Sequence, residues 1–207
     1  MTASGVRILL VALGALLAVA GPLAADEPVI VALGDSLTAG FGLLPEDAYP
    51  TLLEQRLRRE GYHYRVVNAG VSGDTTAAGL RRVDWVLRSR PAVVIVALGA
   101  NDGLRHQSVA AMRDNLVEIV KRLRAAGAGV LLAGMRVPPN YGAEFAQAYE
   151  AVFTDLAKAH KIALAPDLMA GFGERLEFFL PDRIHPNESA QPAVLDNVWK
   201  ALRPLLK

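Results

Sequence analysis

Two segments near opposite ends of the chain carry residues that can act together as a nucleophile and a base. Gly34-Asp35-Ser36-Leu37 places a serine directly after a short apolar run, and Asp182-Arg183-Ile184-His185 places a carboxylate three residues before a histidine. The carboxylate can accept a hydrogen bond from one imidazole nitrogen, which leaves the other nitrogen to take a proton from a serine. Taken by itself, Ser36 fits a helix cap or a phosphate loop equally well.

Two segments rich in glycine and asparagine lie between the serine and the histidine. They are Asn68-Ala69-Gly70-Val71-Ser72-Gly73-Asp74-Thr75 and Gly99-Ala100-Asn101-Asp102-Gly103. Glycine lets a backbone approach a ligand closely, and an Asn side chain beside a backbone N–H can supply two donors to an oxyanion. Either segment can equally be a simple turn, because Gly, Asn and Asp favour turns.

The elements that must position these segments alternate between strand and helix. Short apolar runs predict strands over 28–33, 62–67, 91–98, 129–133 and 162–165. Helical spacing predicts helices over 50–60, 75–89, 108–126, 144–160 and 188–205. This alternation predicts an α/β fold, with one mainly parallel five-stranded sheet between two helix layers in a single domain over residues 26–207. In such a sheet, ligands bind beyond the carboxyl ends of the strands, where all four segments lie.

The first 25 residues have the layout of a secretory signal peptide. Arg7 precedes an uncharged apolar run over 8–20, and Gly21-Pro22 and small residues up to Ala25 follow it. Cleavage is expected after Ala25, with Ala20 as the alternative position. The competing interpretation is an uncleaved anchor, but the run is shorter than the roughly 18–20 residues that a spanning helix needs. The mature chain is therefore expected to be periplasmic or secreted, without stable membrane insertion.

The composition excludes several classes of site and partner. The chain has 207 residues and no cysteine, which rules out disulfides, cysteine zinc sites, iron–sulfur clusters and a catalytic thiol. The 22 Lys and Arg residues balance 21 Asp and Glu residues, and this argues against binding of nucleic acid.

Taken together and in order, the four segments resemble the four motif blocks of the SGNH hydrolases, also called GDSL esterases. The resemblance covers essentially the whole mature chain and is greatest to the bacterial periplasmic branch of arylesterases, multifunctional acyl-CoA thioesterases and lysophospholipases. It implies a flavodoxin-like SGNH hydrolase fold. One departure is Ala100, where this branch often has a second glycine.

The resemblance also implies roles for individual residues. Ser36 would be the nucleophile, His185 the general base and Asp182 the residue that orients it. The backbone N–H groups of Ser36 and Gly73 and the side-chain amide of Asn101 would form the oxyanion hole. No metal or organic cofactor is implied. The substrate would be a small-molecule ester or thioester, such as an aryl ester, an acyl-CoA or a lysophospholipid.

A loop after the fourth predicted strand is the candidate for acyl recognition. Arg136-Val137-Pro138-Pro139-Asn140-Tyr141-Gly142 should lie at the same sheet edge as Ser36, and the resemblance favours Asn140 and Tyr141 as substrate-binding residues. The alternative is that Tyr141 only packs on the domain.

Two competing functions remain open from the sequence: a carbohydrate O-acetyl esterase, and a non-catalytic ligand-binding module on the same fold. The apolar stretch Leu43-Leu44-Pro45 favours acyl-chain substrates, and the presence of every proposed catalytic side chain favours an enzyme. We expect the protein to be a monomer.

Overall fold

A five-stranded parallel sheet forms the centre of the computed structural model, which describes residues 27–207. Its strands are β1 (Val29–Gly34), β2 (Arg65–Gly70), β3 (Val93–Ala97), β4 (Gly129–Ala133) and β5 (Ala163–Ala165). They lie in the order β2-β1-β3-β4-β5, and every neighbouring pair is parallel. This is the strand order of flavodoxin-like doubly wound sheets, so the predicted α/β fold is confirmed.

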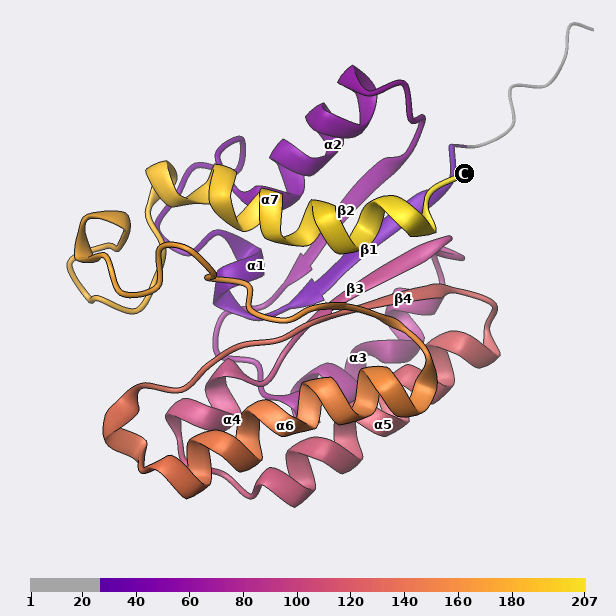
Figure 1. The fold of residues 1–207 in the computed structure, drawn as a ribbon. Helices are drawn as coiled ribbons and strands as arrows, with labels where there is room; N and C mark the ends of the chain where they lie inside the picture. Colours follow the sequence, from indigo (N-terminus) through magenta and orange to yellow (C-terminus); the bar gives the residue numbers. More distant parts are fainter. Residues whose placement is uncertain (1–26) are drawn as a thin grey trace, which may run out of the picture.

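Helices cover both faces of the sheet (Figure 1). One face carries α2 (Tyr49–Arg59) and α7 (Gln191–Leu202), which pack against each other. The other face carries α3 (Thr76–Leu87), α5 (Val109–Ala125) and α6 (Ala143–His160). The short helices α1 (Ser36–Ala39) and α4 (Ala100–Leu104) follow β1 and β3 at the carboxyl edge of the sheet. Single turns of 3-10 helix occupy Pro139–Tyr141, Leu176–Phe178, Glu188–Ala190 and Arg203–Leu205.

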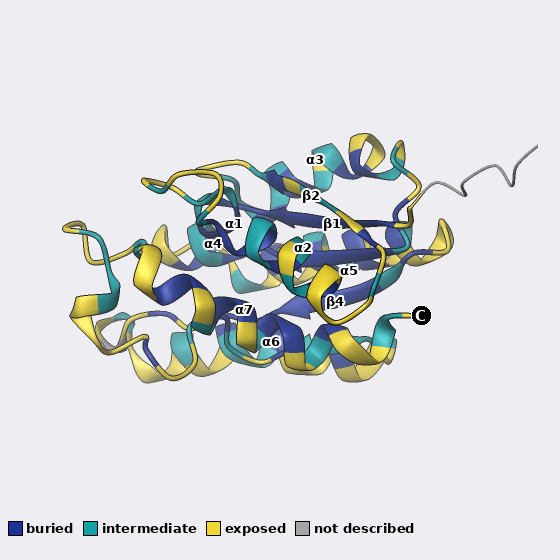
Figure 2. Ribbon diagram, turned by 90° about the horizontal axis from the view of Figure 1, so that it is seen from above, coloured by how far each residue is buried: buried dark blue, intermediate teal, exposed yellow. Residues whose placement is uncertain are grey.

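The central strands are hidden from solvent because helices lie on both sides of them (Figure 2). Every residue of β1 and of β3 is buried, which explains why these strands are apolar on both faces. The helix α5 buries Met112, Leu116, Ile119, Val120 and Leu123, at helical spacings of three and four. This packed core holds the carboxyl ends of the strands in fixed positions.

The second strand begins and ends later than its hydrophobic pattern predicts. The chain leaves α2 through a turn at Gly61, and β2 extends to Gly70, so Asn68 lies in the sheet and not in the loop after it. Because β2 is an edge strand, its side chains are partly exposed, and a polar residue there costs little. The apolar run alone therefore placed this boundary wrongly.

The predicted carboxyl-terminal helix is divided into three pieces. Glu188–Ala190 and Arg203–Leu205 are 3-10 turns, and only α7 between them is α-helical. Pro192 and Pro204 lie in the first turn of the second and third pieces, where a missing backbone N–H is tolerated.

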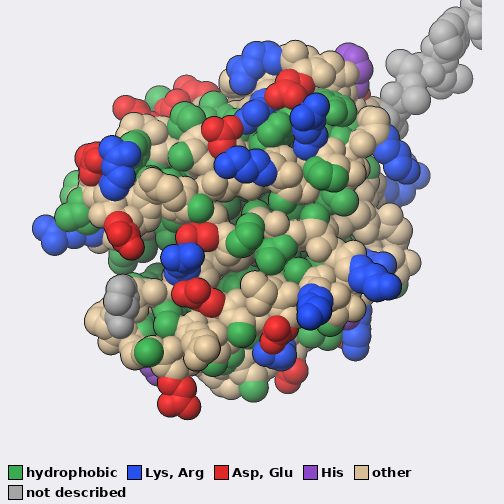
Figure 3. Space-filling model, viewed as in Figure 1, with side chains coloured by type: hydrophobic (Ala, Val, Ile, Leu, Met, Phe, Trp, Pro, Cys, Tyr) green, Lys and Arg blue, Asp and Glu red, His purple; other side chains and the backbone are tan. Residues whose placement is uncertain are grey.

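The expected signal peptide, residues 1–25, lies outside the described residues. Within residues 27–207, no helix combines the length and the apolar character that a membrane crossing requires. On the face seen in Figure 3, basic and acidic side chains are interspersed.

Candidate active site

Ser36 lies at the carboxyl edge of the sheet, at the first position of α1. Asp35 precedes the helix, and its Oδ1 accepts a hydrogen bond of 3.0 Å from the backbone N–H of Leu37. Gly40 ends the helix in the left-handed conformation, with φ 77°. One capped turn of helix therefore holds Ser36 directly after the buried strand β1.

The structure brings Ser36, His185 and Asp182 together, although Ser36 and His185 are 149 residues apart in the chain. The Nε2 of His185 lies 2.9 Å from the Oγ of Ser36. The Nδ1 of the same ring lies 2.7 Å from the Oδ2 of Asp182. Both distances are those of hydrogen bonds, so the three predicted side chains form one continuous chain from hydroxyl to carboxylate.

His185 is held in place by contacts within its own loop and by a contact with Phe41, which lies just after α1. The backbone N–H of Leu180 donates a hydrogen bond of 2.8 Å to the carbonyl of His185, and Phe179 forms an antiparallel bridge with Pro186. The ring of Phe41 lies against the imidazole, with 4.4 Å between the ring centroids. These contacts keep the imidazole oriented toward Ser36, as a proton acceptor requires.

Asp182 is held in its ionised form by the donors around it. The pKa of Asp182 is lowered to about 2, first by the hydrogen bond from the His185 ring and then by the backbone N–H groups of His185 and Ile184. Those backbone donors lie 3.0 Å and 2.9 Å from Oδ1. An ionised carboxylate bonded to Nδ1 favours the imidazole tautomer that can accept a proton at Nε2.

The segments that carry Gly73 and Asn101 lie next to each other. The Nδ2 of Asn101 donates a hydrogen bond of 2.9 Å to the backbone carbonyl of Asp74, the residue after Gly73. The guanidinium of Arg105 joins the same two segments, at 3.2 Å from the carbonyl of Gly73 and 3.4 Å from the Oδ1 of Asn101. Gly73 has φ 85°, a conformation that favours glycine.

The end of β2 packs closely against α1, and this brings the Gly73 segment to Ser36. A Cβ placed on Gly70 would lie 2.2 Å from the backbone nitrogen of Ala39, so only glycine permits this approach. The backbone N–H of Val71 also donates a hydrogen bond of 3.0 Å to the carbonyl of Gly34. All three predicted oxyanion donors therefore belong to segments that touch one another.

Two further acidic residues of the motif segments are buried among structural partners. Asp102 accepts hydrogen bonds from the backbone N–H and the hydroxyl of Thr76, at 2.8 Å and 2.6 Å, and so fastens α4 to the start of α3. Burial raises the pKa of Asp35 to about 6. Its Oδ2 has no hydrogen-bond partner within the part of the chain that the structure describes.

The predicted acyl loop is attached to the segment that carries Asn101. The hydroxyl of Tyr141 donates a hydrogen bond of 2.9 Å to the carbonyl of Leu104, the last residue of α4. Its ring also lies 5.8 Å from the ring of His106, measured between centroids. Tyr141 is partly buried against the core, whereas Asn140 is exposed. Packing and substrate contact are both compatible with this position of Tyr141.

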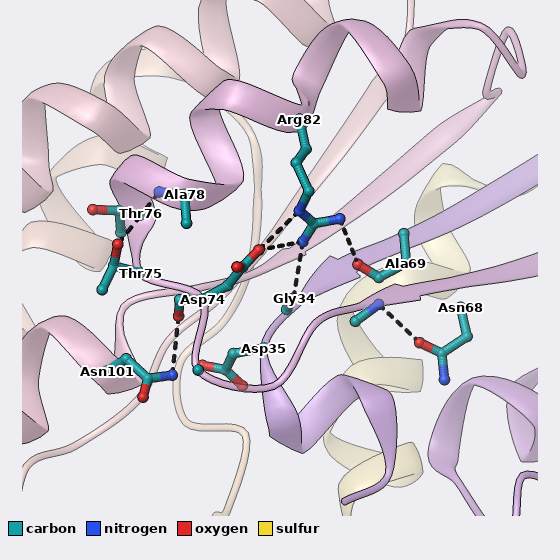
Figure 4. A network of polar contacts seen from close by, with 12 residues as sticks. Gly34, Asp35, Asn68, Ala69, Asp74, Thr75, Thr76, Ala78, Arg82 and Asn101 are labelled. Carbon is teal, nitrogen blue, oxygen red and sulfur yellow. Dashed lines mark hydrogen bonds and ion pairs between the residues drawn. The ribbon is translucent and has the colours of Figure 1, made fainter.

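Sequence reasoning missed Arg82, which connects several of these segments (Figure 4). Its guanidinium binds the Asp74 carboxylate and the backbone carbonyls of Ala69 and Gly34. The sequence carries no signal for these contacts, because Asp74 lies in the loop before α3 and the two carbonyls belong to strand ends, so no single helical or strand period relates them to Arg82. Within residues 27–207, no three His, Asp or Glu side chains are grouped as metal ligands would be.

The chain is similar to known proteins over most of its length. Residues 32–191 match the GDSL-like Lipase/Acylhydrolase family. Esterase TesA of Pseudomonas aeruginosa is 43% identical over 183 residues, which cover 88% of this chain and 91% of that protein. Thioesterase 1/protease 1/lysophospholipase L1 of Escherichia coli is 37% identical over 184 residues, covering 88% of this chain and 87% of that protein.

A solved structure also superposes on the described fold. The crystal structure of TesA has a TM-score of 0.84 and 44% sequence identity, over 86% of this chain and 99% of the other. Because the family match spans most of the chain and the relatives match nearly their whole length, the chain belongs to the GDSL-like lipase/acylhydrolase family of hydrolases that act on ester bonds.

Proposed function

We propose that this hydrolase is a serine esterase that cleaves carboxylic esters and thioesters through an acyl-enzyme. The observation that carries the proposal is the hydrogen-bonded chain in which His185 lies 2.9 Å from the Ser36 hydroxyl and 2.7 Å from the Asp182 carboxylate. His185 takes the Ser36 proton at Nε2 while Oγ attacks the carbonyl carbon. Asp182 orients the imidazole and stabilises its protonated form.

The oxyanion of the tetrahedral intermediate is stabilised by three donors: the backbone N–H groups of Ser36 and Gly73 and the side-chain amide of Asn101. A primary amide has two N–H bonds, and the Asp74 carbonyl accepts only one from Asn101, which leaves the second for the oxyanion. Collapse of the intermediate expels the alcohol or thiol, which takes the proton from His185. Water, activated by the same base, then releases the acid.

The proposed substrates are aryl esters, acyl-CoA thioesters and lysophospholipids. Support comes from the names of the relatives, which include an esterase and a thioesterase and lysophospholipase. Asn140 and Tyr141 would contact the acyl chain, since the loop that carries them follows β4 at the carboxyl edge and is bonded to α4.

We also propose that the enzyme acts outside the cytoplasm as a monomer. The support for action outside the cytoplasm is the charge and hydropathy pattern of residues 1–25, which is typical of a signal peptide. Residues 26–207 would then form the mature single domain.

Labelling with a fluorophosphonate tests the nucleophile. The wild-type protein is expected to be labelled at Ser36, and Ser36→Ala should abolish labelling and lower kcat on a short aryl ester by about 10⁴-fold or more. Ser72→Ala removes an exposed serine from the neighbouring Gly73 segment and is the matched control. This variant should keep both the labelling and the kcat of the wild type.

Three results would contradict parts of the proposal. If Ser36→Ala retained more than about a tenth of the wild-type activity, Ser36 would be excluded as the nucleophile. Absence of labelling and of hydrolysis on every ester would indicate the non-catalytic binding module. Preference for acetylated sugars over acyl-CoA and lysophospholipid would indicate the carbohydrate O-acetyl esterase.

A further inference from the structure

We infer that Arg82 is a positioning residue for the oxyanion hole. Its guanidinium forms hydrogen bonds with the segments that carry the proposed oxyanion donors. Arg82 lies in the second half of α3 and is not among the residues that the family motifs predict. The inference rests on the proposed oxyanion roles of Ser36, Gly73 and Asn101, and it adds to them a residue that touches neither the substrate nor the reacting atoms.

Three acceptors surround the Arg82 guanidinium (Figure 4). Its Nε and Nη2 lie 2.8 Å and 2.6 Å from the Oδ2 of Asp74. Its Nη1 lies 3.1 Å from the carbonyl oxygen of Ala69, and Nη2 lies 3.3 Å from that of Gly34. The side chains of Arg82 and Asp74 are only 23% and 13% exposed, so water competes little with these bonds.

Each acceptor belongs to a segment that carries one proposed donor. Gly34 ends β1 two residues before Ser36, and Ala69 lies in β2 four residues before Gly73. Asp74 directly follows Gly73, and its backbone carbonyl accepts the hydrogen bond from the Asn101 side chain. Arg82 therefore fixes the first two segments directly and the Asn101 amide through Asp74.

The hydrogen bond from Asn101 to the backbone carbonyl of Asp74 determines the direction of the second N–H of the Asn101 amide. The two N–H bonds of a primary amide lie in one plane at a fixed angle, so the acceptor of one sets the direction of the other. If the carboxylate of Asp74 loses its cation, the backbone at Asp74 is freed to move, and both Gly73 and Asn101 move with it. A displacement of about 1 Å at a catalytic group can cost about 10²-fold in rate.

A lysine cannot replace this arginine. Guanidinium is planar and offers five N–H donors in a fixed fork, whereas an ammonium is a compact charge on a flexible stem. Arg82→Lys therefore retains the positive charge beside Asp74 but cannot reach all three acceptors. The charge and the geometry of the site can thus be tested separately.

The experiment compares Arg82→Lys and Arg82→Ala with the wild type on a short aryl ester. We expect Arg82→Lys to lower kcat by about 10- to 100-fold with KM changed by less than about twofold, as for donors used in the transition state. Millimolar guanidinium chloride should restore part of the kcat of Arg82→Ala, and ammonium chloride at the same concentration should not. Arg81→Lys, on the exposed neighbour, is the control and should keep the wild-type kcat.

A double-mutant cycle with Asn101→Ala completes the test. If Arg82 acts by placing Asn101 and Gly73, the losses in kcat from Arg82→Lys and Asn101→Ala should be less than additive. A kcat of Arg82→Lys within about twofold of wild type, or a loss seen only in KM, would overturn the inference. If Asn101→Ala itself keeps full kcat, the proposed oxyanion hole fails, which is a different result from the failure of Arg82 alone.

Discussion

Replacing Asp35 by asparagine should remove a pH dependence of stability that the wild-type protein has. Asp35 is fully buried beside the nucleophile, and burial raises its pKa from 3.8 to about 6. Between these two values the folded protein holds a proton that the unfolded chain has lost. The contribution of Asp35 to stability is therefore fully present below pH 3.8 and is lost as the pH rises through about 6.

The size of the effect follows from the two pKa values. At about 1.4 kcal/mol for each tenfold change in the ionisation equilibrium, the ionised Asp35 costs folding about 3 kcal/mol at pH 7 and about 0.5 kcal/mol at pH 4. Asparagine keeps the Oδ1 acceptor for the Leu37 N–H but places an amide nitrogen where Oδ2 was. An unsatisfied buried donor costs about 1–3 kcal/mol at every pH, so the pH dependence identifies the effect better than the stability at one pH.

Urea unfolding followed by circular dichroism at pH 4, 5, 6 and 7 measures the difference directly. Relative to wild type, the free energy of unfolding of Asp35→Asn should rise by about 2–3 kcal/mol from pH 4 to pH 7. Asp114→Asn, at an exposed position of α5, controls for the loss of one negative charge. A difference that stays constant within about 0.5 kcal/mol across this range would refute the reasoning.

Three further predictions concern the proposed site. Asn101→Ala should lower kcat on a short aryl ester by about 10²–10³-fold with little change in KM, and steady-state kinetics showing only a raised KM would mean ground-state binding instead. Tyr141→Ala should lower kcat/KM for octanoyl esters by about tenfold more than for acetyl esters, since each buried methylene contributes about 0.8 kcal/mol; an equal loss on both would remove the loop from the acyl site. Activity should fall on acidification because His185 must be neutral to accept a proton, while Asp182, with its pKa lowered to about 2, stays ionised. The measurement is a pH profile of kcat/KM, in which the acid side should fall with the slope of a single protonation. EDTA should have no effect on the activity.

The sequence by itself determined the fold class and the residues that could do chemistry. Buried parallel strands such as β3 are apolar on both faces, and amphipathic helices such as α5 repeat every three or four residues, so both are visible as local periodicity. The four segments were identifiable because together and in order they resemble the motif blocks of the SGNH hydrolases, whereas each one alone also fits a turn or a helix cap. Boundaries were less certain: β2 extends to Gly70 because an edge strand accepts polar residues.

The family resemblance implied that Ser36, His185 and Asp182 act together, but local residue patterns alone did not decide which residues meet, and the tertiary structure does. The bond between Ser36 and His185 joins positions 149 residues apart, and no local pattern encodes such a separation. The same holds for Arg82, whose partners lie at the ends of two strands and in a loop. The packing of whole helices and strands determines the hydrogen-bond partners of a buried polar side chain, because packing brings a donor and an acceptor to within about 3 Å of each other. Local periodicity records only which face of an element is buried, and not which residue of another element it will meet there.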